Sequence, residues 1–243
     1  MTAEREAFLA IDTSGSGAGV ALVSGGRVDT MLLPVRDGGA ARTEDLAACA
    51  SGLLAARGLA IPDLTGLGAV VGPGSYTGLR SGLAFARGLA FPGRLPAVAV
   101  PSLELLAWRE AGEGETVLAA WPASQGLTLA GLFERTVDDI VARAPAEVVA
   151  DAECPSVLAR MGSSCAALVV PVERGAALAA AAAAAGLAFR PAGGDGLAAL
   201  AELVVSRWRR GLASRVEDLL PVYVGQSTAR PNRARVAVAE ATE

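Results

Sequence analysis

A glycine-rich turn in the middle of the chain constrains the fold more than any other stretch. It reads Gly-Pro-Gly-Ser-Tyr-Thr-Gly-Leu-Arg over residues 72–80 and follows Leu67–Val71, an apolar run that predicts a buried strand. Pro73 lacks a hydrogen-bond donor and therefore ends the strand. Beyond the turn, apolar residues recur at helical spacing and predict a helix over 78–90. Strand, turn and helix in succession indicate an α/β fold.

The turn itself allows two interpretations. Its amides and the positive end of the helix dipole could bind a phosphate, with Gly74, Ser75 and Thr77 as candidate nucleotide-binding residues. Glycine turns before helices are also common in proteins that bind nothing there. In that case Ser75 or Thr77 only caps the helix.

The predicted helix carries small residues in a row. Gly78, Gly82 and Ala86 follow one another at a spacing of four, which lets another element approach the helix closely. That element is either a helix of a partner protein or the sheet of this chain. Arg80 and Arg87 share a second stripe, which we expect to face solvent or a partner.

The composition excludes several kinds of chemistry. The chain has 243 residues and no histidine, and all 21 of its basic residues are arginine. The lack of histidine excludes a Ser-His-Asp triad and any imidazole metal site, and the lack of lysine excludes a P-loop or Schiff-base lysine. Chemistry on paired carboxylates, or magnesium held by oxygens, stays open. No metal site is predicted.

Charge and cysteine content indicate the environment of the protein. A formal net charge of -4 does not suggest a broad nucleic-acid footprint. Three cysteines without ligand spacing suit a reducing compartment. No secretory signal is recognised, and the alanine-rich run over 175–189 is too short and too weakly apolar to span a bilayer. We therefore expect a soluble, cytoplasmic protein without a membrane partner.

The chain begins with a strand, a tight turn and an antiparallel return. Strands are predicted at 8–12, 18–23 and 27–35, and Asp12, Thr13 and Ser14 open the first turn. Such a beginning resembles that of actin-like and sugar-kinase-like ATPases, where an aspartate at the strand end helps to hold magnesium. The alternative is that Asp12 merely starts a turn with local hydrogen bonds.

Later patterns predict the division of the chain. A helix over 43–57, capped by Thr43, carries Leu46 and Leu53 on its apolar stripe. A strand at 97–100 precedes a helix capped by Ser102, and this junction is the predicted lobe boundary. A helix with arginines in its last turn starts near residue 195, and 220–224 is extended. We expect a first lobe over 1–101, a second lobe over 102–225, and a mobile tail over 226–243.

Three blocks of the sequence resemble the TsaB (YeaZ) family. They are Leu-Ala-Ile-Asp-Thr-Ser at 9–14, the turn at 72–80, and Leu-Pro-Val-Tyr-Val at 220–224. The turn is the specific match, and the clear resemblance covers roughly residues 8 to 101. The family supplies the dimerisation subunit of the bacterial machinery that makes threonylcarbamoyladenosine in tRNA.

The resemblance implies an actin-like (ASKHA, ribonuclease H-like) fold with two lobes, each a mixed sheet flanked by helices. It also implies a non-catalytic subunit that binds the catalytic TsaD through first-lobe helices, forms a complex with the ATPase TsaE, and homodimerises when alone. TsaD carries metal-binding histidines, which this chain lacks. The resemblance implies that this subunit contacts tRNA only indirectly, through its partners. Direct contact of tRNA with Arg80, Arg87 or Arg230–Arg235 is the less favoured alternative. The expected partner-interface residues are Leu46, Leu53, Gly78, Arg80, Gly82 and Ala86.

Two alternatives remain. The chain could be an ATP-dependent phosphotransferase or ATPase that uses Asp12, although no Asp-x-Gly-Thr motif opens the second lobe and Asp138, Asp139 and Asp151 are expected to be solvated. It could also hold ATP or ADP with magnesium structurally, at the partner interface. The nucleotide-binding candidates are Asp12, Thr13, Ser14, Gly74, Ser75 and Thr77.

The chain also departs from the family pattern. Arg42-Thr43-Glu44 lacks the histidine that members usually carry before the Thr and Glu. The turn at 121–126 lacks the acid and the arginine found there in many members. A ligand role for that turn is therefore in doubt.

Overall fold

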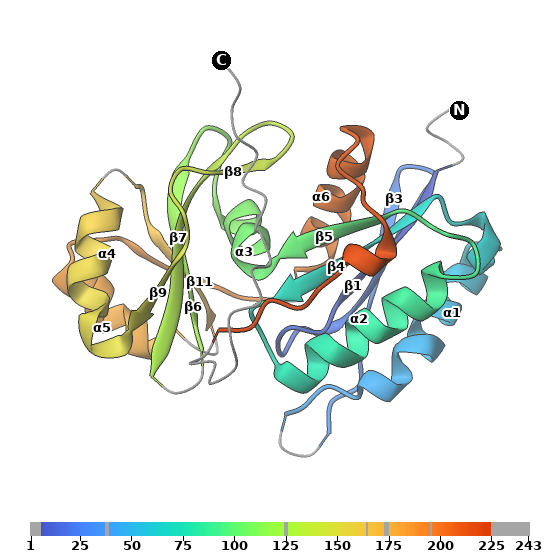
Figure 1. Cartoon of the computed structure of the whole chain (residues 1–243), viewed down its shortest axis with the longest axis horizontal. Coiled ribbons are helices and arrows are strands. Elements are labelled where there is room, and N and C mark those ends of the chain that lie inside the picture. Colours follow the sequence, from blue (N-terminus) through green and yellow to red (C-terminus); the bar gives the residue numbers. More distant parts are fainter. Residues whose placement is uncertain are drawn as a thin grey trace.

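The computed structural model describes residues 6–36, 39–123, 126–163, 165–172, 175–194 and 196–224. It contains two β-sheets that lie on either side of a central helical layer (Figure 1). The predicted tail 226–243, with Arg230–Arg235, lies outside the described residues, as do Asp195 and the middle of the turn at 121–126.

The first sheet has the order β3-β2-β1-β4-β5. Its first three strands form an antiparallel meander, and β4 and β5 run parallel to β1. Four of the strands are rich in valine, leucine or alanine, which suits burial on both faces, whereas the edge strand β3 is mostly exposed. The strands are β1 (Ala7–Asp12), β2 (Gly19–Ser24), β3 (Arg27–Leu32), β4 (Gly66–Gly72) and β5 (Ala97–Pro101).

Helices cover both faces of this sheet. α1 (Leu46–Ala56) and α2 (Tyr76–Ala90) pack on one face, and α6 (Leu197–Arg209) packs on the other. Because side chains alternate along a strand, Leu9 and Ile11 of β1 point to the α1/α2 side. Phe8 points to the α6 side, where its ring centroid lies 5.1 Å from that of Trp208 in an edge-to-face contact.

The second sheet has the order β11-β10-β6-β7-β8, and β9 pairs with β7. α4 (Cys154–Gly162) and α5 (Ala176–Ala184) cover its outer face, at the left of Figure 1. α5 is the alanine-rich run, which thus forms a helix. The strands are β6 (Thr116–Pro122), β7 (Leu127–Arg135), β8 (Ile140–Ala142), β9 (Glu147–Ala150), β10 (Leu168–Pro171) and β11 (Phe189–Ala192).

The largest core lies between the two sheets. α3 (Ser102–Glu110) and α6 fill this space and contact strands of both sheets or each other. Their buried side chains, such as Leu106 and Leu200, pack against Val98 of the first sheet and Val117 of the second. The two halves of the molecule therefore share one continuous core. Short 3-10 helices occur at η2 (Thr43–Asp45), η3 (Ile61–Asp63), η4 (Asp151–Glu153) and η6 (Val216–Asp218).

Two mixed sheets flanked by helices confirm the expected actin-like fold. The predicted boundary falls between β5 and α3, but the range 102–225 needs correction at its far end. There α6 packs on β1 and β2, and Val222 donates its amide to the carbonyl of Val71 at 2.7 Å. The C-terminal part of the described chain thus returns to the first sheet, because its apolar face is buried there.

Two predicted helix caps are wrong. Thr43 begins a 3-10 turn, and no side-chain cap bond forms at the start of η2 or α1. Ser102 donates its hydroxyl to the carbonyl of Pro73 at 2.6 Å instead of capping α3. At Ser102 the hydroxyl is directed to a residue 29 positions earlier in the chain, a tertiary contact that the local pattern does not indicate.

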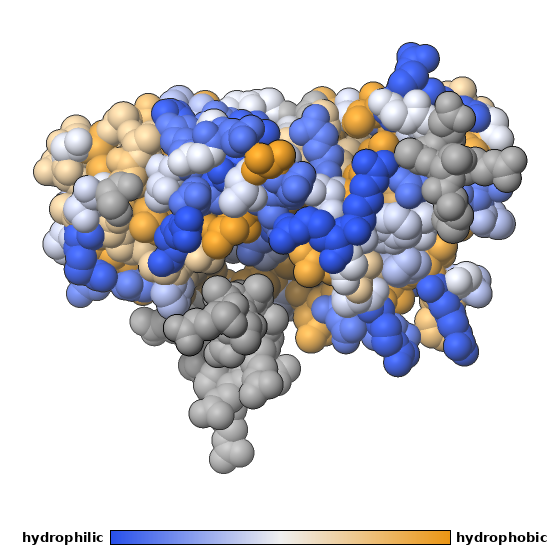
Figure 2. Space-filling model, turned by 90° about the horizontal axis from the view of Figure 1, so that it is seen from above, coloured by the Kyte–Doolittle hydropathy of each residue, from blue (hydrophilic) through white to orange (hydrophobic). Residues whose placement is uncertain are grey.

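Within the described part of the chain, no helix has the length and apolar character needed to cross a bilayer. The face of the molecule that Figure 2 presents carries apolar residues in small separate groups among polar ones.

Candidate functional site

Asp12 ends β1 and organises the turn that follows. Its carboxylate accepts hydrogen bonds from the amide of Ser14 at 2.8 Å and from the Ser14 hydroxyl at 2.7 Å. Asp12 is only 7% exposed, and Thr13 and Ser14 are buried as well. These contacts form a local turn in which an acidic side chain binds the backbone two residues later.

The first half of α2 packs directly onto this turn. A Cβ atom at Gly78 would lie 2.2 Å from the Thr13 carbonyl oxygen, and one at Gly82 would lie 2.1 Å from Thr13 Oγ1. One at Gly74 would lie 2.5 Å from the Ser14 carbonyl oxygen. Only glycine permits such close approach. The row of small residues therefore serves the contact between α2 and the end of β1.

The structure brings the six predicted nucleotide-binding residues together. The Ser75 amide donates to the Ser14 carbonyl at 2.7 Å, which joins the glycine-rich turn to the Asp12 turn. Ser75 also caps α2, as its hydroxyl accepts from the Gly78 amide at 3.2 Å. The hydroxyls of Ser75 and Thr77 are on exposed residues, whereas Thr13 faces α2.

A cavity of about 40 Å³ lies beside Asp12, between the two sheets. This volume accommodates a few water molecules. Asp12 is the one acid and Arg109 the one base among its lining residues, and the Arg109 guanidinium donates to the Gly193 carbonyl. Among the described residues no group of three or more potential metal ligands occurs. The lining therefore offers a single carboxylate that already accepts two hydrogen bonds, a poor fit for magnesium with a nucleotide.

The structure corrects most of the predicted partner interface. Leu46 and Leu53 are 2% and 6% exposed and pack in the core between α1 and the first sheet. Gly78, Gly82 and Ala86 are buried under α2. Spacing alone did not reveal that both stripes serve the chain's own core. Of the six predicted residues, Arg80 is exposed, and its guanidinium contacts Tyr76.

The outward face of α1 and α2 is built from small residues. α1 contains no charged residue along its length. We define the α1–α2 surface as the exposed small residues of both helices. They are Ala47, Ala48, Ser51, Gly52, Ala55, Ala56, Ala84 and Gly88. Beside it, Met31 and Leu32 of β3 are also exposed.

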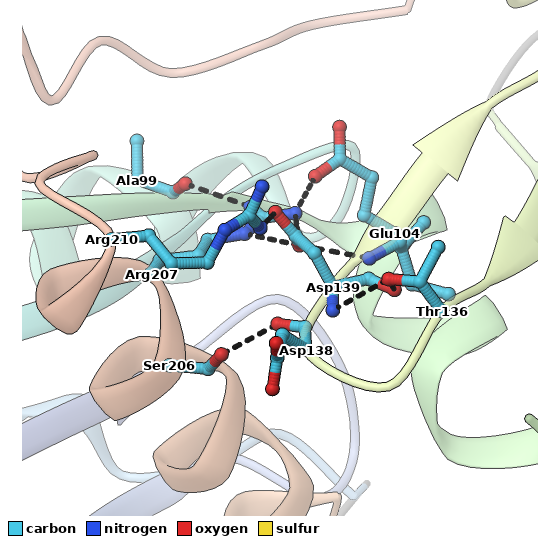
Figure 3. Close-up of polar contacts among 9 residues, drawn as sticks. Ala99, Glu104, Thr136, Asp138, Asp139, Ser206, Arg207 and Arg210 are labelled. Atoms are coloured by element: carbon cyan, nitrogen blue, oxygen red, sulfur yellow. Dashed lines mark hydrogen bonds and ion pairs between the residues drawn. The ribbon is translucent and has the colours of Figure 1, made fainter.

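Sequence analysis missed a buried ionic cluster between the halves of the molecule (Figure 3). Arg207 of α6 donates to Glu104 of α3 at 2.6 Å and to Asp139, which precedes β8, at 2.9 Å. Arg210 pairs with Asp139 as well. The expectation that Asp139 is solvated is wrong, since it is 7% exposed. One signal was available: Arg207 follows Val204 by three residues and so falls on the buried stripe of α6.

The charges in this cluster influence one another. Burial raises the pKa of the Glu104 carboxyl, although the Arg207 guanidinium opposes this effect. The two acidic residues raise the pKa of Arg207 against the opposing effect of its burial, which is the largest single influence on that group. The cluster is therefore a network of ion pairs that joins α3, α6 and the turn before β8.

Comparisons with known proteins find similarity to proteins of threonylcarbamoyladenosine formation in tRNA. A family model described as TsaD, tRNA N6-adenosine threonylcarbamoyltransferase, matches residues 39–154. The chain is 31% identical over 137 residues to the tRNA threonylcarbamoyladenosine biosynthesis protein TsaB of Escherichia coli (strain K12). That match covers 55% of this chain and 57% of the relative, so it spans little more than half of that protein.

Solved structures resemble the whole fold. YeaZ from Pseudomonas aeruginosa superposes with a TM-score of 0.65 and 23% identity over 90% of this chain and 100% of that one. A second Pseudomonas aeruginosa protein, described as similar to the peptidase YEAZ, gives a TM-score of 0.63 and 24% identity over the same shares. At these identities the likeness establishes the fold.

Proposed function

We propose that this chain, which resembles a TsaB protein in sequence and YeaZ in fold, belongs to the TsaB (YeaZ) family and is a non-catalytic scaffold subunit of the bacterial complex that forms threonylcarbamoyladenosine in tRNA. In this role it binds and supports a TsaD-like catalytic subunit. The α1–α2 surface is the contact, in place of the buried residues predicted from the sequence.

The observation that carries this proposal is the character of α1. A helix without charged residues is normally buried on all sides. Yet α1 exposes five alanine, glycine or serine residues within Ala47–Ala55, and Ala56 extends this face by one residue. Short side chains allow a partner helix to approach the backbone closely, and covering them removes apolar surface from water. Met31 and Leu32 extend the apolar area beside it.

The chemistry available to this chain supports a non-catalytic role. The sequence has no histidine, so it cannot supply the metal-binding histidines of a TsaD-like subunit. Asp12 is the one acid at the cavity and already holds its own turn. The alternative of an actin-like ATPase or phosphotransferase gains no second carboxylate from the described residues that line the cavity.

Further partners follow from the same proposal. A TsaE-like ATPase would join the complex, tRNA would be its substrate, and the cytoplasm would be its location. Alone, the protein would homodimerise through the α1–α2 surface, because the same small side chains suit a second copy. A bound nucleotide remains a prediction, to be tested by adding ATP.

The test is to mix the purified protein with the TsaD-like subunit of the same organism. Size-exclusion chromatography with light scattering, with and without ATP, then measures the mass of the species formed. We expect a stoichiometric heteromer. Absence of any heteromer in both conditions would overturn the scaffold proposal.

A matched pair of variants locates the surface. Ala48→Arg places a long charged side chain on the exposed face of α1, and Ala183→Arg does the same on the exposed face of α5. Both changes keep a strong helix former. Only Ala48→Arg should abolish the heteromer. If both variants bind equally well, the contact lies elsewhere.

A further inference from the structure

The two tyrosines of the chain lie side by side on its surface. Tyr76 begins α2 and Tyr223 lies in the C-terminal extended segment, yet their ring centroids are 5.0 Å apart at an interplanar angle of 38°. Tyr76 is 59% exposed and Tyr223 48% exposed. About half of the surface of each tyrosine is thus accessible to another molecule.

Arg80 completes this cluster. Its guanidinium carbon lies 5.3 Å from the Tyr76 ring centroid, and its Nη1 donates to the Tyr76 hydroxyl at 2.8 Å. A cation at this distance from a ring is attracted to its face. None of the ion pairs among the described residues involves Arg80. Its charge therefore remains available to an anion.

The fold places Tyr223 here by backbone contacts. The Val222 amide bonds the Val71 carbonyl at the end of β4, and Arg87 of α2 donates to the Leu219 carbonyl. The segment is thus held against β4 and α2 by two contacts that precede Tyr223 in the chain. The pair is a fixed platform and needs little ordering when a ligand arrives.

The charge at the platform suits a nucleic acid. Arg80 lies against the Tyr76 ring and forms no ion pair among the described residues, so a phosphate beside a stacked base would neutralise it. Exposed aromatic faces beside arginine are how proteins bind unpaired bases.

We propose that Tyr76, Tyr223 and Arg80 form a stacking platform for an unpaired base of single-stranded RNA, with Arg80 on the adjoining phosphate. The inference rests on the proposed function, in which RNA is the substrate of the complex, and adds a direct contact between this subunit and that RNA. On α2, Tyr76 and Arg80 precede Ala84 and Gly88, the residues that this helix contributes to the α1–α2 surface. The platform can therefore be tested separately from partner binding.

The experiment titrates the full-length protein into a fluorescein-labelled, unstructured 12-nucleotide RNA and follows fluorescence anisotropy at fixed salt. Tyr76→Ala removes one ring face, and the affinity should fall about 5- to 150-fold, the range that corresponds to about 1–3 kcal/mol per stacked base. Tyr76→Phe keeps the ring and should bind within about twofold of the original protein. Phe91→Ala removes another exposed aromatic, 72% exposed at the far end of α2, and should have no effect.

Two further measurements separate stacking from simple charge attraction. Arg80→Ala should lower the slope of log affinity against log salt by about 0.7, as expected for one phosphate contact on a single strand. The same RNA annealed to its complement should bind more weakly, because its bases are no longer free to stack. Circular dichroism confirms that each variant is folded.

The outcomes distinguish this inference from the proposed function. If the protein forms the heteromer but Tyr76→Ala and Phe91→Ala bind the RNA as well as the original protein, the platform is wrong and the scaffold role stands. If Tyr76→Ala loses the heteromer and not the RNA, the pair is a protein contact and the inference is overturned. If no heteromer forms in any variant, the proposed function fails instead.

Discussion

The guanidinium of Arg207 reaches the carboxylate of Asp139 across the boundary between the two halves of the molecule. The distance from Nε to Oδ1 is 2.9 Å, although 68 residues separate the two in sequence. Both residues are buried, and Glu104 shares the same guanidinium. One element packed on the first sheet is thereby joined to a turn of the second sheet (Figure 3).

This arrangement predicts a large effect of removing the arginine. Arg207→Met leaves Glu104 without its counter-charge and Asp139 with Arg210 alone, and should lower the free energy of unfolding by about 3–5 kcal/mol. Arg209→Ala is the control, because its pair with Glu6 lies at the surface and should contribute no more than about 1 kcal/mol. Urea unfolding measures both. Similar losses in the two variants would contradict a specific role for the buried cluster.

The contact between α2 and Thr13 predicts opposite effects at two glycines of one helix. Gly82→Ala should destabilise the protein, since the new Cβ would lie 2.1 Å from Thr13 Oγ1. Gly88→Ala meets nothing within 4 Å and should stabilise it by about 0.8–1.0 kcal/mol through helix propensity alone. Thermal unfolding gives both values.

A double-mutant cycle checks the cause. If the Thr13 hydroxyl is the obstacle, Thr13→Ala should recover part of the stability lost in Gly82→Ala. Strictly additive losses would place the clash elsewhere. The cycle matters for the partner surface too, because a bulky residue at Gly82 would disturb the core and not only a partner.

The ion pair between Glu115 and Arg190 predicts a pH dependence. The Arg190 hydrogen bond and the Gly112 amide lower the pKa of the Glu115 carboxyl below its usual value near 4.5. The unfolded state therefore binds a proton more readily than the native state, and this contribution is present above about pH 4.5 and lost as the pH falls through the native pKa. Arg190 is 38% exposed, so the effect should stay below about 1 kcal/mol.

Glu115→Gln should remove that part of the acid destabilisation. Urea unfolding at pH 7, 5 and 3.5 would show a flatter profile in this variant. Glu113→Gln, an exposed neighbour in the same loop, is the control and should keep the original profile. A profile unchanged by Glu115→Gln would show that the pair does not contribute.

Asp12 provides a test of the enzymatic alternative. Asn keeps an oxygen that accepts the Ser14 amide, so Asp12→Asn should cost only about 1 kcal/mol of stability. We expect the same background rate of phosphate release from magnesium-ATP in both proteins. Turnover in the original protein that disappears in Asp12→Asn would instead support an ATPase.

Local patterns in the sequence predicted many of the elements and the family. Apolar runs marked β1, β2 and β4 within a residue or two, and helical spacing up to Ala90 marked α2. The three-block resemblance indicated the actin-like fold. These signals are local, since each depends on a few neighbouring side chains and the backbone they favour.

Other features depended on contacts that no local pattern encodes. A stripe of small residues requires a close neighbour, but only the packing decided that this neighbour is Thr13 rather than a partner helix. From its position in the sequence, Arg207 is a cation near the end of a helix. The structure buries it beside Asp139, because α6 packs between the two sheets. Tyr76 and Tyr223 met only because the chain after α6 returned to the end of β4.

The sequence by itself indicated the resemblance to the TsaB (YeaZ) family, most of the α/β elements and the absence of histidine chemistry. The tertiary structure decided which faces of those elements are buried, and so moved the candidate partner surface from Leu46, Leu53 and Gly82 to the exposed side of α1. The physical reason is that a helix pattern defines which residues share a face, whereas burial depends on what lies opposite that face. That neighbour comes from parts of the chain distant in sequence.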